Sequence, residues 1–410
     1  MRNQEQMAPS RAACRYGIEV NAPTGEPKQC VKTSTAEGRG EQLPQRFDAC
    51  VVLMGPSTRA VSGVSTHIRQ LSGSALRESI KFLHFQVGSE GRAVNTALRT
   101  AVRFLFGPVA FGSFLMRHRP DVVHINTSLV LKSFWRDLLF LVVAKLFRCK
   151  VVYQIHGGAL PQQFFAGNAL LTELLRKVLE SVDAVVLLAR SELLAYEAFA
   201  PSVRFELVAN GIDPARLMRE PLRTVSSGPL RLAYVGRLAA EKGLFEALDA
   251  LALLASEGRE VSLTIAGQGP DESRLIAKAK EMNLSDRVRF AGPVYDEAKE
   301  EVLRAAQVFT LPTYAEGLPY ALLEAMAAGA VPVATPVGAI PDVLEDGVHG
   351  LLVSAKDSAA LAAAIRRLDD DRQLLAEMAV AGRARILERY TATRVASDFG
   401  RLYSSLLCGH

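Results

Sequence analysis

Short apolar runs of strand length alternate with longer, helix-length segments along most of this 410-residue chain. Apolar strands that alternate with helices predict parallel sheets with both faces covered, because each helix carries the chain back across the sheet. In the first half we expect strands at 49–54, 81–87, 121–125, 150–155, 184–188 and 204–208. In the second half we expect strands at 230–235, 261–266, 288–290, 308–311, 331–334 and 351–353. The pattern therefore predicts an α/β fold with two doubly wound sheets.

A turn and a loop separate the two series of strands. Asn210-Gly211-Ile212-Asp213-Pro214 is a turn signal, and a loop follows to about Gly228. A chain of this length with 49% hydrophobic residues is long enough for two full cores. We therefore predict two Rossmann-like domains, at 48–220 and 221–391, that face each other across a cleft. Ligands of such sheets bind at the carboxyl ends of the strands, so the cleft is the expected site.

Residues 1–47 do not follow this pattern. They are polar and rich in Gly, Pro, Gln, Ser and Thr, without a sustained hydrophobic period. Such a composition buries too little apolar surface to fold, so we expect a disordered N-terminal tail. The polar start argues against a signal peptide. The five cysteines are scattered and form no Cys-x-x-Cys pair, which favours a reduced, cytoplasmic protein without structural zinc.

Charge is distributed unevenly between the two halves. Residues 1–220 carry 27 Lys and Arg against 18 Asp and Glu, whereas residues 221–410 carry 21 against 25. A basic first half suits an anionic membrane surface as a partner, although ordinary surface charge explains it equally well. The apolar stretches 101–116 and 138–147 are too short or too interrupted to span a bilayer, but either suits a membrane interface.

Two positions of the first half are candidates for ligand contact. Gly63 lies in a glycine-containing loop between the first strand and its helix, where free N–H groups attract anions; a plain turn is the alternative. His156 ends a strand and precedes Gly157-Gly158, which is the position that ligands of parallel sheets use. His124, by contrast, lies inside its strand, and we expect a structural role for it.

The stretch 312–336 contains the most informative charged residues. Glu316 lies in a loop, and Gly317-Leu318-Pro319 leads into a helix that we expect at 319–328, with Pro319 in its first position. This helix is apolar almost all round and is therefore expected to be buried. Glu324 is its one charge. A buried carboxylate needs a hydrogen-bond donor, either from the protein or from the hydroxyl groups of a ligand.

Two loops after strands of the second half complete the set of candidates. Arg237 and Lys242 flank the start of a helix, and two cations beside open N–H groups suit a diphosphate; a solvated loop is the alternative. Gly267-Gln268-Gly269 lacks the third glycine of a dinucleotide fingerprint, so we interpret it as a tight turn near the base of a ligand.

Several other chemistries lack support in the sequence. The chain has no Walker phosphate-binding loop, no His-Glu-x-x-His and no Gly-x-Ser-x-Gly, which argues against kinase-type ATP chemistry, zinc hydrolysis and nucleophile-elbow hydrolysis. Glu316 and Glu324 have the composition of a glycosidase pair. Their placement, one on a loop and one inside a buried helix beside an expected diphosphate site, argues against that activity.

Taken together, the motifs resemble the family-4 glycosyltransferases of the GT-B fold, of the bacterial surface-polysaccharide type. The resemblance is carried by Gly236-Arg237…Lys242-Gly243, by Glu316-x7-Glu324 and by 210–213, and it covers about residues 49–405. It implies retaining transfer of a hexose from a nucleotide-diphosphate sugar to a lipid-linked or glycan acceptor, without a metal or other cofactor and without nucleic acid. It also implies that the last helix, at about 392–407, crosses back to the first domain.

The resemblance assigns the donor phosphates to four residues. Arg237 and Lys242 would hold the diphosphate, and the amides of Gly317 and Leu318 would contact phosphate. The loop at Gly63 would approach donor and acceptor. Many relatives carry a second glycine in that loop, whereas this chain has Ser62, whose hydroxyl is a possible donor to phosphate.

The remaining roles concern the sugar and the ribose. The resemblance implies that Glu324 bonds the ribose hydroxyls, that Glu316 faces the sugar, and that His156 lies near the reacting sugar. His156, Glu316, Arg237 and Lys242 are thus the expected catalytic residues. A sugar-nucleotide epimerase and an inactive donor-binding subunit, both of the same architecture, are the alternatives. We expect a cytoplasmic enzyme, peripheral on the inner face of the membrane.

Overall fold

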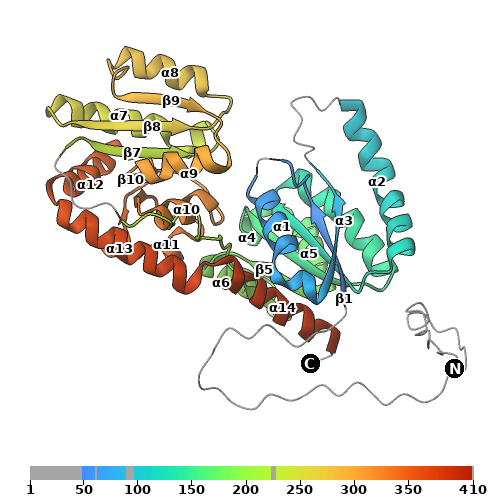
Figure 1. The fold of residues 1–410 in the computed structure, drawn as a ribbon. Coiled ribbons are helices and arrows are strands. Elements are labelled where there is room, and N and C mark those ends of the chain that lie inside the picture. Colours follow the sequence, from blue (N-terminus) through green and yellow to red (C-terminus); the bar gives the residue numbers. More distant parts are fainter. Residues whose placement is uncertain (1–48, 61, 89–96, 223–227, 409–410) are drawn as a thin grey trace, which may run out of the picture. The chain divides into compact units, whose positions relative to one another are not determined.

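The computed structural model describes residues 49–60, 62–88, 97–222 and 228–408, and it contains two six-stranded parallel sheets (Figure 1). The first sheet has the order β2-β1-β3-β4-β5-β6 and the second the order β12-β11-β10-β7-β8-β9. The predicted α/β class and two-sheet architecture are confirmed. The expected disordered tail at 1–47 lies outside the described residues.

Every strand of the first sheet overlaps a range predicted from the sequence. Val51 on β1 is paired with Phe82 on β2 and with Val122 on β3, so β1 lies inside the sheet. The strands are β1 (Ala49–Gly55), β2 (Ile80–Gln86), β3 (Val122–Leu129), β4 (Lys150–Gly158), β5 (Ala184–Leu187) and β6 (Phe205–Leu207). The connecting helices are α1 (Gly63–Gly73), η1 (Ala75–Glu78), α2 (Ala97–His118), α3 (Leu131–Leu146), α4 (Pro161–Phe164), α5 (Ala169–Ser181) and α6 (Arg190–Phe199).

The second sheet is built in the same way around its central strands. Its strands are β7 (Leu230–Val235), β8 (Val261–Ala266), β9 (Val288–Gly292), β10 (Val308–Leu311), β11 (Val331–Ala334) and β12 (Leu351–Leu352). The helices are η2 (Ala240–Lys242), α7 (Leu244–Ser256), α8 (Glu272–Glu281), α9 (Asp296–Ala305), α10 (Tyr320–Ala328), α11 (Ile340–Val343), α12 (Ser358–Asp370) and α13 (Arg372–Arg389). Pro319 precedes α10 as its N-cap residue, with ψ of 124°, rather than occupying the first helical position as predicted.

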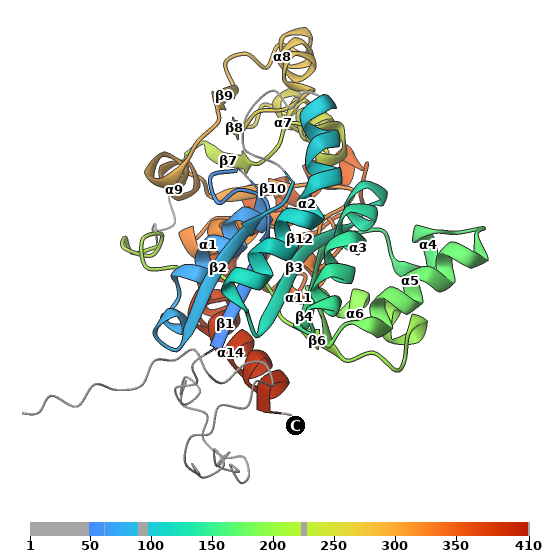
Figure 2. The same cartoon turned by 90° about the vertical axis from the view of Figure 1, so that its right-hand side faces the viewer.

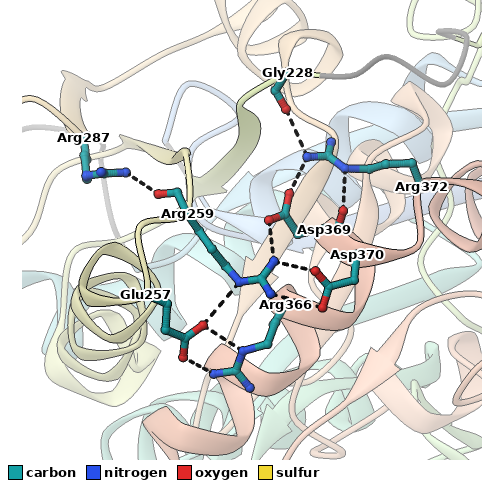
Figure 3. A network of polar contacts seen from close by, with 8 residues as sticks. All are labelled: Gly228, Glu257, Arg259, Arg287, Arg366, Asp369, Asp370 and Arg372. Atoms are coloured by element: carbon teal, nitrogen blue, oxygen red, sulfur yellow. Dashed lines mark hydrogen bonds and ion pairs between the residues drawn. The ribbon is translucent and has the colours of Figure 1, made fainter.

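An ionic network fixes helix α12 against the end of helix α7 (Figure 3). Arg259 donates to Glu257 at the end of α7 and to Asp369 and Asp370 at the end of α12. Arg372, at the start of α13, donates to the Gly228 carbonyl at 3.0 Å. Gly228 is the first residue described after the linker, so this bond connects the start of the second half to the network. Exposed ion pairs contribute little one by one, but a network that shares Arg259 restrains four segments at once.

Helix α14 (Ala392–Cys408) packs into the core of the first sheet, although it follows the second sheet in the chain. Its fully buried Phe399 and Tyr403 share a hydrophobic cluster with Val51 of β1 and Ile68 of α1. Figures 1 and 2 both show α14 beside β1. The domain boundaries at residues 220 and 391 stay predictions.

Helices α2 and α3 lie side by side on the first sheet (Figure 2). They contain the two apolar stretches singled out in the sequence. Within the described residues, neither they nor any other helix combines the length and the hydropathy that crossing a bilayer requires.

We predict that Phe399→Ala lowers the free energy of unfolding by about 3–5 kcal/mol, because the ring is fully buried and its loss leaves a cavity. Leu387→Ala on α13, where the side chain is 55% exposed, is the control and should change stability by less than about 0.5 kcal/mol. Urea unfolding followed by circular dichroism measures both. Equal effects of the two variants would contradict the placement of α14 in the core.

Candidate active site

The loops after β7, β8 and β10 pack against one another at the carboxyl ends of the second sheet. Gly243 has a φ of +70°, and a Cβ atom there would lie 1.9 Å from the carbonyl oxygen of Pro312. Gly267 has a φ of +147°, and a Cβ atom would lie 1.8 Å from the carbonyl oxygen of Gly236. L side chains are disfavoured by both the angle and the space. These glycines therefore bring the candidate residues of the three loops together.

Lys242 and Glu316 form an ion pair across two of these loops. The Lys242 Nζ atom lies 2.5 Å from Glu316 Oε1, and each side chain is 18% exposed. Arg237, on the same loop as Lys242, is 66% exposed and lies 3.8 Å from Glu241. The structure thus joins Lys242 to Glu316 directly and leaves most of the Arg237 side chain in solvent. The roles proposed for these residues toward a donor stay predictions.

The turn Gly317-Leu318 is held by its carbonyl groups. The carbonyl of Gly317 accepts from the Ala339 amide at 2.9 Å, and that of Leu318 accepts from Asn210 Nδ2 at 2.7 Å. Among the described residues, neither amide of the turn donates a hydrogen bond to the protein. The turn leads directly into α10, so these amides lie where a helix start attracts anions.

Glu324, the one charge of α10, meets a protein donor. Lys299 of α9 donates to Glu324 Oε1 at 2.6 Å, and the carboxylate side chain is 13% exposed. Burial raises the pKa of Glu324, and the nearby Lys299 ammonium counteracts part of that rise. The sequence left open whether Glu324 meets a donor of the protein or the hydroxyl groups of a ligand, and in the structure it meets a donor of the protein. A ribose contact through the remaining carboxylate oxygen stays a prediction.

The loops of the first sheet reach the same turn. A Cβ atom on Gly317 would lie 2.9 Å from the His156 carbonyl oxygen, and one on Gly157 would lie 3.3 Å from Gly317 Cα. A Cβ atom on Gly63 would lie 3.7 Å from the ring of Tyr320, the first residue of α10. Candidate residues of both halves, Gly63 and His156 with Gly317, thus lie close together.

His156 belongs to a cluster of three histidines. Its Nε2 atom lies 2.9 Å from Asn126 Oδ1, and its ring centroid lies 5.1 Å from that of the buried His67. Burial, followed by the proximity of His67 and His124, lowers the pKa of His156 well below its ordinary value. His124 hydrogen-bonds Tyr403 at 2.6 Å and Gln154 at 3.0 Å. It is therefore enclosed by protein, as its position inside a strand led us to expect.

Ser62 caps helix α1. Its hydroxyl oxygen accepts from the Ser65 amide at 3.1 Å and lies 2.9 Å from the Ser65 hydroxyl. A serine N-cap stabilises a helix by about 1 kcal/mol. Ser62 thus has a local structural role in addition to the phosphate contact expected from the sequence.

Sequence reasoning missed Lys299, Asn126 and His67. Lys299 lies 25 residues before its partner Glu324, and Asn126 lies 30 residues before His156. No spacing within one helix or strand relates such pairs, because the parallel sheet and its crossover helices bring them together. The one available signal was the charge of Glu324 on an otherwise apolar helix. It indicated that a donor was needed but did not identify the residue that supplies it.

Comparisons with known proteins identify the protein family of this chain. The family described as "Glycosyl transferases group 1" matches residues 223–385, and the "Glycosyl transferase 4-like domain" matches residues 41–211. A glycogen synthase of Mycobacterium tuberculosis is 30% identical over 297 residues, which cover 70% of this chain and 69% of the relative.

Solved structures share the fold at low sequence identity. Sucrose-phosphate synthase from Thermosynechococcus elongatus is 19% identical, with a TM-score of 0.72, and the match covers 88% of this chain and 100% of that one. The Anabaena protein HepE in complex with UDP-glucose is 16% identical, with a TM-score of 0.68 and coverage of 87% and 100%. The two sheets are thus those of a GT-B glycosyltransferase. The chain belongs to the family-4 glycosyltransferases.

We predict that Lys299→Met raises the pKa of Glu324 further, because the carboxylate keeps its burial and loses its cation. A carboxyl group whose pKa is higher in the folded than in the unfolded chain stabilises the fold at low pH, and this contribution is lost as pH rises from about 4.3 through the folded-state value. In the variant this loss should be larger, on the order of 1–3 kcal/mol, and should extend to higher pH.

Urea unfolding between about pH 4 and pH 8 measures this effect. The double variant Lys299→Met/Glu324→Gln is the matched control, since it has no carboxyl group to titrate and should lose the added pH dependence. If the single and double variants share one pH profile, the Lys299–Glu324 pair does not govern the titration.

Proposed function

We propose that this glycosyltransferase moves a hexose, with retention of configuration and without a metal ion, from a nucleotide-diphosphate sugar to a lipid-linked or glycan acceptor. The observation that carries the proposal is the close packing of the loops after β7 and β10, which carry Arg237, Lys242 and the Gly317-Leu318 amides and which Lys242 and Glu316 join directly. These groups offer positive charge and N–H donors to one anion. The glycogen synthase name of one relative and the UDP-glucose in HepE agree with this donor class.

The proposed chemistry depends on charge that develops on the leaving group. As the bond between the sugar carbon and the phosphate oxygen breaks, negative charge grows on the nucleotide diphosphate. Arg237 and Lys242 would neutralise it, which is the task that a metal ion performs in other enzymes. For Lys242 to do so, its contact with Glu316 must open or be shared with the phosphate.

Retention would follow from attack on the face that the phosphate leaves. The acceptor hydroxyl oxygen forms the new bond to the sugar carbon, and its proton passes to the departing phosphate oxygen. Positive charge on the sugar is stabilised by that same phosphate. His156 has a lowered pKa and is a weak base, so its place in this scheme is contact with the sugar rather than removal of the proton.

We predict that Arg237→Ala and Lys242→Ala each lower the rate of transfer by about 10²–10³, by analogy with the loss of one preorganised donor. Arg289→Ala, an exposed cation on β9 of the same sheet, is the control and should leave the rate unchanged. Sugar release and transfer are measured with UDP-, GDP- and ADP-sugars in the presence of EDTA.

Three outcomes of this assay would count against the proposal. Loss of activity on chelation would contradict a metal-free site. A product that forms without any acceptor and keeps its nucleotide would indicate an epimerase. Binding of nucleotide sugar without turnover across a broad set of acceptors would indicate a donor-binding subunit.

A lipid-linked acceptor is favoured by the exposed surface of helices α2 and α3. Large apolar side chains face solvent there, at Phe106, Val109 and Met116 on α2 and at Leu131, Trp135, Leu139, Val142 and Leu146 on α3. The exposed cations Arg117, Lys132 and Arg148 border them. An apolar surface edged by cations suits the interface of an anionic bilayer, so we propose peripheral association through this surface.

We predict that the protein co-sediments with phosphatidylglycerol-containing vesicles and that Trp135→Ser/Leu146→Ser weakens this binding at least tenfold. Leu170→Ser is the matched control, because Leu170 on α5 is 84% exposed but lies outside the α2–α3 surface. Binding should also fall as salt is raised, since exposed charges are screened. If neither the double substitution nor added salt changes vesicle binding, the α2–α3 surface is not the membrane-binding surface.

A further inference from the structure

The orientation of the buried Asn126 amide is fixed by a backbone carbonyl. Asn126 on β3 is 3% exposed, and its side chain bridges two neighbours. Its Nδ2 atom donates to the Met54 carbonyl oxygen at 3.1 Å. A carbonyl only accepts, so the amide nitrogen must face Met54 and the amide oxygen must face His156, 2.9 Å from Nε2.

This orientation dictates which nitrogen of His156 carries the hydrogen. The Asn126 oxygen only accepts, so Nε2 of His156 must donate and therefore bears the proton. A neutral imidazole has one such hydrogen, which leaves a lone pair on Nδ1. The ring is neutral at physiological pH because burial, His67 and His124 lower its pKa.

The Nδ1 atom of His156 is unpaired and is not fully enclosed by the described residues. No hydrogen bond to it is formed by the described residues, and it is not among the enclosed polar atoms of the molecule, in contrast to Nε2 of His67. His156 lies two residues before the end of β4, next to the Gly317 turn. A ligand at that turn would therefore meet a hydrogen-bond acceptor.

We propose that Asn126 is a positioning residue that holds His156 in the Nε2–H tautomer, so that His156 binds a sugar hydroxyl through Nδ1. A phosphate oxygen cannot donate and is thereby disfavoured at this position. The assignment of the sugar to this place rests on the proposed function, whereas the tautomer itself does not. Asn126 acts through His156 and needs no contact with substrate.

The tautomer is tested without substrate by long-range ¹H–¹⁵N correlation spectra of the protein labelled at histidine. His156→Gln identifies the His156 signals by their loss. We expect a protonated Nε2 and an unprotonated Nδ1 in the wild type and a mixture of tautomers in Asn126→Ala.

Gln154→Met is the matched control, because Gln154 is an equally buried amide on the adjacent strand that hydrogen-bonds His124 instead. It should leave the proton of His156 on Nε2. A wild-type spectrum with the proton on Nδ1 would overturn the proposal, and so would an unchanged tautomer in Asn126→Ala.

The role in binding is tested with donor sugars that lack single hydroxyl groups. In the wild type, removal of the hydroxyl that bonds Nδ1 should lower kcat/KM about tenfold, as expected for one hydrogen bond. In Asn126→Ala that penalty should shrink, while affinity for the free nucleotide diphosphate stays the same. Equal penalties in both proteins would exclude the contact, and absence of transfer with every donor would refute the proposed function while leaving the tautomer result intact.

Discussion

Close backbone contact between neighbouring loops is the constraint on which the candidate site depends. The loops after β7, β8 and β10 approach so closely that side chains at Gly243 and Gly267 would overlap neighbouring carbonyl groups. This packing places the loop of Lys242 beside that of Glu316, and their ion pair joins the two loops. The same constraint acts between the two halves, where Gly157 of the first and Gly317 of the second let the two backbones approach closely.

The parts of the fold that local sequence determines were predictable. Strands such as β7 and β8 are short apolar runs with a helix-forming segment after each, and their bounds agree with the predicted ranges. Residues near the carboxyl ends of strands, such as Arg237 after β7 and His156 two residues before the end of β4, were predictable as ligand-facing positions because parallel strands end at one edge. Pro319 shows the limit of local signals. It was predicted at the first helical position but is the N-cap, and these two positions differ by only one residue.

The partners of the candidate residues were not predictable, because they come from elsewhere in the chain. Glu324 was recognisable as a buried charge in need of a donor, but Lys299 reaches it from a different helix. Asn126 contacts His156 because β3 and β4 are neighbours in the sheet, and its orientation depends on Met54 on a third strand. Such contacts depend on sheet order and register, which one sequence does not specify.

The position of α14 has a consequence for the order in which the protein is made. Phe399 and Tyr403 complete the core around β1 and α1, yet about 180 residues separate β6 from α14. At a synthesis rate of about 5–20 residues per second, the first domain waits on the order of 10–40 s for its last helix. Until then His124 lacks Tyr403 and apolar surface stays uncovered, so the N-terminal half depends on the ribosome finishing the chain.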